Sequence, residues 1–173
     1  MASIGHLAVG MACGRAYSED RALAKKAMVA LSVISLWPDV DVIGFAFGVR
    51  YGDPWGHRGA THSLAFAAIL GLGAYLYAMK KRLPLLRTSL FAAGVAASHG
   101  ILDTMTYGGG LGVALLWPIS QVRFWAPLRF IPVAPIGLRL LSPHGMFVML
   151  FETILFSPFF LYAFFAGRKK NVR

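Results

Sequence analysis

The stretch GHRGATHS, residues 56–63, places two imidazoles five residues apart in a chain that has only five histidines. A spacing of five suits a loop and the first turn of a helix better than one helical face. Arg58, between His57 and His62, could bind a phosphate or carboxylate, or could simply reach lipid headgroups. A lone histidine here would more often be an interfacial polar residue than a ligand, so a metal site requires partners from elsewhere in the chain.

Two other stretches offer carboxylates. His99 and Asp103 in HGILD are four residues apart, so on a helix they share one face and could bind one ion or simply form a buried structural pair. An ionisable side chain inside a membrane segment costs about 2.5–3.5 kcal/mol and usually marks function. Asp39 and Asp41 in PDVD follow Pro38, which helps to end a helix. In a turn both could face one cation, although Asp after Pro is also a common cap or turn residue.

Taken together, these residues predict a metal site. Four of the seven acidic residues lie in or beside apolar segments: Asp39, Asp41, Asp103 and Glu152. Four histidines complete a set of nitrogen and oxygen ligands without sulfur: His6, His57, His62 and His99. Such a set fits Zn²⁺, Mn²⁺ or Fe²⁺ better than Cu⁺. Eight candidates exceed one four-coordinate shell, so we expect two ions, bridged by a carboxylate such as Asp103, which could activate water and hold a phosphoryl oxygen.

The composition indicates where these residues must be positioned. Hydrophobic residues make up 57% of the 173-residue chain and charged residues 14%, with a mean hydropathy of +0.63, which predicts a membrane protein. The length suits a single domain over residues 1–173. The net charge of +10 could suggest nucleic acid, but the basic residues flank apolar runs, so we expect no nucleic-acid partner. The single Cys13 excludes a disulfide framework, and the N-terminus lacks the basic region of a signal peptide.

We therefore expect an all-α, multi-pass membrane helical bundle with about four to five membrane segments. The second segment should stop at PDVD and continue as the apolar but Gly-containing VIGFAFGV. Residues 115–141, rich in Pro, Trp and Arg, should lie in the membrane interface. In chain order the predicted segments are Ile4 to about Tyr17, Ala27 to Trp37, Leu64 to Met79, Ser89 to about Tyr107, and Gly145 to Ala166.

Basic residues predict the orientation of this bundle. If the 18–26 and 80–87 connections and the C-terminus face the cytoplasm, that side holds 12 of the 17 Lys and Arg residues, as the positive-inside rule favours. All five histidines then fall on the opposite side, which predicts one site at the extracytoplasmic face of the membrane. That side keeps five arginines: Arg50, Arg58, Arg123, Arg129 and Arg139.

Several motifs also carry a resemblance. GH near the N-terminus, LWPDVDV, GHRGATHS, SHGILDTMTYGGG and LLWP…RFWAP follow, in order and over nearly the whole chain, the pattern of the YdjM-like family of membrane-bound, metal-dependent hydrolases, described as LexA-regulated in some bacteria. That family is similar, more remotely, to zinc-dependent phospholipases C and P1-type nucleases. Those enzymes hold a third ion with a His/His/Glu group, whereas only His144 and Glu152 remain here, so we expect no third ion. The relation implies two adjacent ions held by His6, Asp39, His57 or His62, His99 and Asp103.

The sequence thus predicts an inner-membrane, metal-dependent hydrolase, most plausibly with two zinc ions, although manganese or iron would also fit. Its substrate would be a phosphoester of a phospholipid-like molecule, since a shallow site among membrane helices meets headgroups first. Asp41 would complete the metal shell or act as general base towards the activated water. Arg58 would bind phosphate, with Arg123 or Arg129 as weaker candidates. The predicted metal ligands are Asp39, His99 and Asp103 first, followed by His6, His57 and His62.

Two other functional classes stay open at this point. A non-enzymatic, metal-stabilised scaffold or stress-response protein predicts a closed coordination shell, whereas catalysis needs an open position. A transporter or channel predicts polar residues in both halves of the membrane, and the inner halves of these segments are nearly bare.

Overall fold

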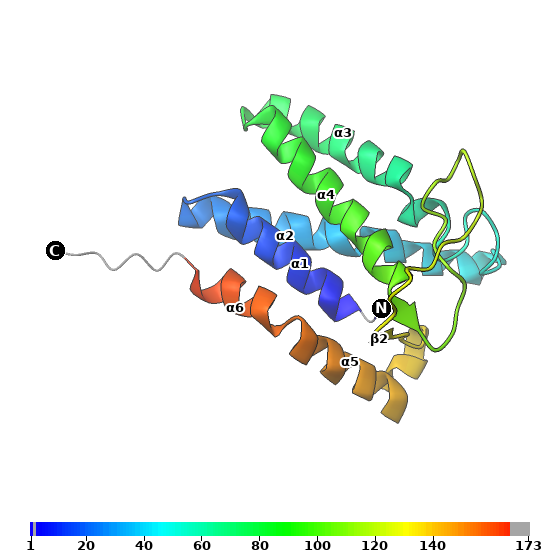
Figure 1. Cartoon of the computed structure of the whole chain (residues 1–173). Coiled ribbons are helices and arrows are strands. Elements are labelled where there is room, and N and C mark those ends of the chain that lie inside the picture. Colours follow the sequence, from blue (N-terminus) through cyan, green and yellow to red (C-terminus); the bar gives the residue numbers. More distant parts are fainter. Residues whose placement is uncertain (2, 167–173) are drawn as a thin grey trace.

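The structure is a computed structural model that describes residue 1 and residues 3–166. Within this part the chain forms a helical bundle with very little extended structure, which confirms the predicted all-α class (Figure 1). The α-helices are α1 (Ser3–Tyr17), α2 (Arg21–Leu36), α3 (Leu64–Lys81), α4 (Leu85–Thr104), α5 (Pro143–Leu155) and α6 (Ser157–Phe165). Shorter elements are the 3-10 helices η1 (Trp37–Phe47), η2 (Ala60–His62) and η3 (Gly137–Leu141) and the parallel strands β1 (Thr106–Tyr107) and β2 (Ile131–Pro132).

Helices α1 and α2 pack with their backbones close together because α1 carries two glycines four residues apart. A Cβ atom on Gly10 would lie 2.6 Å from Ser32 Cα, and one on Gly14 would overlap the backbone of Met28. Glycines at this spacing are typical of closely packed membrane helices, where small residues replace a large apolar core. Ala24 of α2 is buried as well and fits the same arrangement. This packing fixes the N-terminal turn of α1, and with it His6, against the rest of the bundle.

Pro38 ends α2, but the chain does not turn away there. It continues as η1, with Pro38 in the first turn, where its missing N–H is not needed. Together α2 and η1 form a 27-residue apolar stretch, Arg21–Phe47, long enough to cross a membrane. The sequence correctly places the end of the α-helix at PDVD and an apolar continuation after it, but it does not predict that this continuation is helical. The two aspartates instead lie on a 3-10 helix that continues the span.

Among the residues that the structure describes, three helical stretches are long and apolar enough to cross a membrane: Arg21–Phe47, Leu64–Lys81 and Leu85–Thr104. The predicted helix from 145 to 166 is two helices, α5 and α6, which are bent by 53° and would make a fourth span if they act as one. Pro158 in the first turn of α6 explains the break. Helix α1, with 15 residues, is about 22 Å long, shorter than a hydrocarbon core of about 30 Å.

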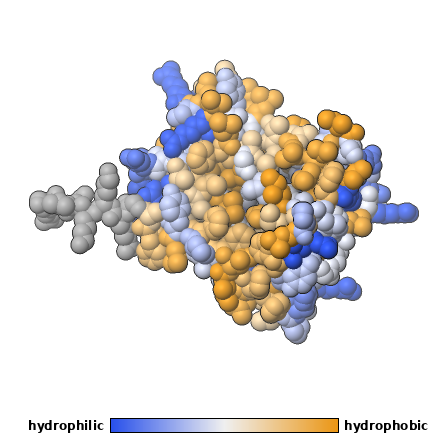
Figure 2. Space-filling view, in the orientation of Figure 1, coloured by the Kyte–Doolittle hydropathy of each residue, from blue (hydrophilic) through white to orange (hydrophobic). Residues whose placement is uncertain are grey.

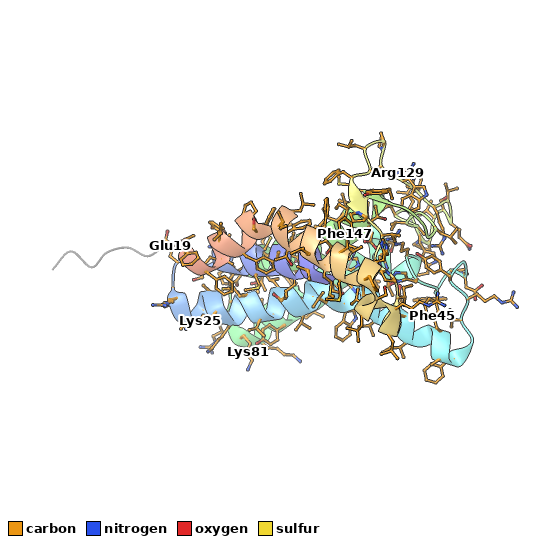
Figure 3. The ribbon with its side chains drawn as sticks, turned by 90° about the horizontal axis from the view of Figure 1, so that it is seen from below. Glu19, Lys25, Phe45, Lys81, Arg129 and Phe147 are labelled. Carbon is orange, nitrogen blue, oxygen red and sulfur yellow. The ribbon has the colours of Figure 1, made fainter. Side chains whose placement is uncertain are left out.

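The surface and the ends of the bundle agree with a membrane location. Figure 2 shows a face that is mostly hydrophobic, with strongly hydrophilic residues mainly towards its margins. Figure 3 places Glu19, Lys25 and Lys81 at one end of the bundle and Phe45 and Arg129 towards the other. The irregular segment between α4 and α5 lies at this second end, beside η1 and the N-terminus (Figure 1). It contains no helix long enough to span a membrane.

Candidate metal centre

Four predicted ligands from three elements meet at this second end. They are Asp39 of η1, His62 of η2, and His99 and Asp103 of α4, and one ligand atom from each lies within 4.8 Å of the others. His99 Nε2 is 3.3 Å from Asp39 Oδ1 and 3.1 Å from His62 Nε2. His62 Nε2 is 3.6 Å from Asp103 Oδ2. This set, called the four-residue group below, offers the two nitrogens and two oxygens that a divalent transition metal binds.

Both imidazoles of the four-residue group are held by their other ring nitrogen. His99 Nδ1 lies 2.6 Å from the carbonyl oxygen of Ser35, and His62 Nδ1 lies 3.2 Å from Asp41 Oδ2. Metal-binding histidines usually donate this second N–H to a carbonyl or carboxylate, which fixes the tautomer and the ring orientation. Both Nε2 atoms are therefore directed at the same point between the carboxylates.

Local structure explains this convergence. The four-residue spacing in α4 puts His99 and Asp103 on one helical face, as predicted. Gly100 lies between them at a point where a Cβ atom would overlap the carbonyl oxygen of His62. The absence of a side chain lets α4 approach η2. Ser63 then caps α3 by accepting a hydrogen bond of 3.0 Å from Phe66 N, which fixes where η2 ends and α3 begins.

Asp41 connects a second group to the first. Asp41, His57 and His62 also place one ligand atom each within 4.8 Å of the others. Asp41 Oδ1 lies 2.8 Å from His57 Nδ1, and Asp41 Oδ2 accepts a hydrogen bond of 2.7 Å from the Thr61 hydroxyl. Both oxygens are thus in use, which favours an orienting role for Asp41. The two groups share His62 through its two different ring nitrogens.

His6 lies next to the four-residue group rather than in it. Its ring stacks on His99 with centroids 3.6 Å apart, and its Nε2 is 3.5 Å from Asp103 Oδ1. Neither ring nitrogen has a hydrogen-bond partner among the described residues, although His6 is fully buried. An unsatisfied buried polar group costs about 1–3 kcal/mol. Asp103 Oδ1 is also 2.7 Å from the N-terminal ammonium of Met1, so a cation that bound His6 and removed this cost would have to replace that ammonium.

The surroundings of His62 show an excess of negative charge. Burial by itself lowers the pKa of the His62 imidazole, but hydrogen bonds to Asp39 and Asp41 and the charge of Asp103 raise this pKa to about 9. An imidazole that keeps its proton at neutral pH indicates a place where a cation is stabilised. Metal binding replaces such a proton, because the ligand nitrogen must be free. The charge distribution therefore fits a divalent ion as well as the ligand atoms do.

Comparisons with known proteins agree with the motifs that identify the site. The family described as YdjM inner membrane protein matches residues 1–170. The inner membrane protein YbcI of Escherichia coli strain K12 is 39% identical over 151 residues, which cover 86% of each chain. The chain belongs to the YdjM inner membrane protein family. No solved structure matches it. Membership of this family and the apolar helices together support a location in the bacterial inner membrane.

In this YdjM-family protein the four-residue group opens on one side. His62, His99 and Asp103 are buried, whereas the side chain of Asp39 is 22% exposed. Asp39, His57 and Arg58 line a cavity of about 660 Å³, within the usual size of ligand pockets. A ligand in the cavity could therefore reach the four-residue group.

The arginines of this end fall into three kinds. Buried Arg58 places its Nε 3.2 Å from Asp103 Oδ2 and lines the cavity, as a phosphate-binding residue would. Arg123 donates to four backbone carbonyls, including those of Tyr51 and His57, and so holds the loops together. Arg129 lies over the Trp125 ring, with its guanidinium 5.5 Å from the ring centroid. Sequence reasoning singled out these three and missed a fourth.

Arg139 of η3 is the arginine that the sequence did not indicate, and it lines the cavity. The only signal in the sequence was its position among the five outer arginines. His144 and Glu152, which the resemblance left over, lie apart from one another. His144 Nε2 is 3.3 Å from the carbonyl of Val133, and buried Glu152 accepts a hydrogen bond of 3.0 Å from Gly5 N. Glu152 thus holds the first turn of α1, which carries His6.

Proposed function

We propose that this protein is a metal-dependent hydrolase that cleaves a phosphoester at the extracytoplasmic face of the inner membrane. The observation that carries the proposal is the four-residue group, whose two imidazoles are oriented by Ser35 and Asp41 and which meets a cavity through Asp39. A purely structural ion would need a closed shell, whereas an accessible carboxylate at the edge of a cavity favours catalysis.

An ion in the four-residue group would polarise a phosphoryl oxygen and lower the pKa of a water molecule. The imidazole and carboxylate ligands favour zinc, with manganese or iron as alternatives. His6 and Asp103 Oδ1 offer two ligand atoms for the second ion that the sequence predicts, which would replace the N-terminal ammonium now 2.7 Å from Oδ1. Asp103 would then use its two oxygens on two sides, since Oδ2 faces His62 and Oδ1 faces His6.

Residues around the ion have separate roles in this proposal. Arg58 binds the phosphoryl group, because its guanidinium lines the cavity beside Asp103. Asp41 orients His62 and His57 through its two oxygens. Its alternative role as general base predicts that Asp41→Asn loses hydrolysis but keeps the wild-type metal affinity.

The first test is the metal content of purified protein, measured by elemental mass spectrometry. We expect close to two equivalents of zinc or manganese in the wild type and a loss of metal in Asp103→Ala and His62→Ala. His144→Ala and Asp53→Ala are matched controls, because neither residue belongs to a ligand group, and they should retain the metal. Circular dichroism would show that each variant is folded.

One equivalent would restrict the proposal to the four-residue group, and phospholipids would still be screened as substrates. Wild-type protein that is folded but binds no metal after dialysis against zinc or manganese would overturn the hydrolase proposal. The scaffold interpretation would then need another source of stability than a metal ion.

A further inference from the structure

The cavity beside the four-residue group is lined by residues of two chemical kinds. Its polar lining includes Asp39, His57 and Arg58. Its apolar lining, called the apolar wall below, includes Val42 and Phe45 of η1 and the segment from Val133 to Ile136. A phosphate-binding site for a small soluble molecule would not need an apolar wall of this extent. The lining instead matches a molecule with an anionic head and a hydrocarbon chain.

Arg139 adds a second cation to this cavity. Its side chain is exposed and lines the cavity, and within the described part of the chain it has no ion-pair or side-chain hydrogen-bond partner. Arg58, in contrast, is buried and is already paired with Asp103. A guanidinium without a partner can form charge-assisted, bidentate hydrogen bonds with a phosphate.

The position of the cavity relative to the apolar surface indicates where its ligand comes from. The η1 wall is the end of the candidate span Arg21–Phe47. Next to Arg139, the apolar side chain of Leu138 is 88% exposed and that of Leu141 is 71% exposed. Exposed apolar residues beside a cation are typical of a surface that lies in lipid headgroups. A lipid can therefore reach the cavity without leaving the membrane.

We propose that this cavity binds a lipid phosphate, with the phosphate between Arg58 and Arg139 and the hydrocarbon chain against Val42, Phe45 and Ile136. As the substrate site of the hydrolase, the inference rests on the function proposed above. The proposed binding of a lipid phosphate is supported by the cavity and the two arginines alone, so it can be tested without measuring catalysis.

The experiment measures binding of dodecylphosphonate to the full chain in micelles of dodecyl maltoside, which carries no phosphate, by calorimetry, with empty micelles subtracted. Its carbon–phosphorus bond is not a phosphoester, so hydrolysis cannot remove it. Arg139→Gln should weaken binding by about ten- to a hundredfold, the range expected when a charge-assisted contact is lost. Arg129→Gln is the matched control, since it removes the same charge from an exposed residue outside the cavity.

A second pair of variants tests the apolar wall. Ile136→Ser should weaken binding several-fold, whereas Leu138→Ser, which changes a residue outside the cavity lining, should not. If methylphosphonate bound as tightly as dodecylphosphonate, the cavity would be a site for a soluble anion, and the lipid part of the proposal would be overturned. If dodecyltrimethylammonium bound as tightly as dodecylphosphonate, recognition of the phosphate by arginine would be overturned. The same would follow if Arg129→Gln weakened binding as much as Arg139→Gln.

The same titration with and without a chelator separates this inference from the proposed reaction. Arginine-dependent binding by a protein that hydrolyses no phospholipid would leave the cavity proposal standing and overturn the hydrolase. Hydrolysis of phospholipids at a rate that Arg139→Gln and Ile136→Ser leave unchanged would support the hydrolase and overturn the cavity proposal.

Discussion

At the scale of single residues, Asp41 decides how the histidines of the site are oriented. It contacts His57, His62 and Thr61 but does not belong to the four-residue group. A carboxylate in this position fixes the histidine tautomer and raises the basicity of the metal-binding nitrogen. Asp41 should therefore act on the metal through His62.

Asp41→Asn tests this role. We expect metal affinity to fall by about 10–100-fold, with unchanged stoichiometry at saturating metal, because the amide is a weaker acceptor for His62 Nδ1. Titration with a competing chelator measures the affinity. Asp20→Asn is the control, since asparagine can cap α2 as aspartate does at the opposite end of the molecule. Wild-type metal affinity with loss of hydrolysis would instead assign Asp41 as the general base.

The residue types of the site could be read from the sequence, but their individual contacts could not. The convergence of Asp39, His62, His99 and Asp103 follows the predicted ligand set. The orientation of the His62 ring, with Nε2 towards Asp103 and Nδ1 towards Asp41, could not be inferred, because it depends on contacts between distant segments. For the same reason it could not distinguish Arg139, which lines the cavity, from Arg123, which binds backbone carbonyls.

At the scale of elements, the approach of α4 to η2 depends on Gly100. The neighbouring carbonyl is that of His62, so any side chain at this position would push the two elements apart. A shift between them would separate His62 from His99 and Asp103, which belong to different elements of the four-residue group.

Gly100→Ala should therefore reduce bound metal strongly while the helices remain folded. Gly94→Ala provides a close control, because Gly94 is in the same helix and a Cβ atom there would have no neighbour within 4 Å. Alanine has a higher helix propensity than glycine at both positions, so propensity alone predicts no difference. Metal content and circular dichroism of the two variants make the comparison. Equal metal content would show that the approach of α4 to η2 is not required.

Glu152 links α5 to the first turn of α1. Glu152→Ala would leave the N–H of Gly5 without this acceptor, at a cost of about 1–3 kcal/mol, and should loosen the turn that carries His6. We expect a lower Tm in detergent and weaker binding of the second ion. Glu152→Gln keeps an acceptor oxygen and should restore most of both. A Gln variant as poor as the Ala variant would show that the charge, rather than the hydrogen bond, is what matters.

Apolar runs predicted α1, α3 and α4 within about four residues, whereas they placed the start of α2 at Ala27 instead of Arg21. The bend between α5 and α6 was missed, although Pro158 is a local signal for it. The apolar continuation after Pro38 was predicted, but its 3-10 conformation could not be inferred, because Pro38 ends an α-helix equally well before a turn or before a 3-10 helix. Packing of η1 beside α4 and η2 selects between these outcomes.

At the scale of the whole molecule, buried ionisable side chains gather at one end. Within the described residues they are His6, His57, Arg58, His62, His99, Asp103 and Glu152, all linked by the contacts of the site or of α1. A transport pathway would require such residues along the membrane normal. Basic residues of the helix ends around the α1–α2 and α3–α4 connections, such as Lys25 and Lys81, lie at the other end (Figure 3). The charge asymmetry therefore predicts that the site faces the exterior.

This orientation can be tested by labelling single cysteines in spheroplasts. In a Cys13→Ala background, Gln121→Cys places a thiol on the irregular segment beside the site, and Glu19→Cys places one between α1 and α2; both positions are exposed. We expect a membrane-impermeant maleimide to label Gln121→Cys in intact spheroplasts and Glu19→Cys only after lysis, because the positive-inside rule holds the lysine-rich end in the cytoplasm. The reverse pattern would place the site in the cytoplasm. In that case its lipid phosphate would have to come from the inner leaflet, and the charge asymmetry would not have determined the topology.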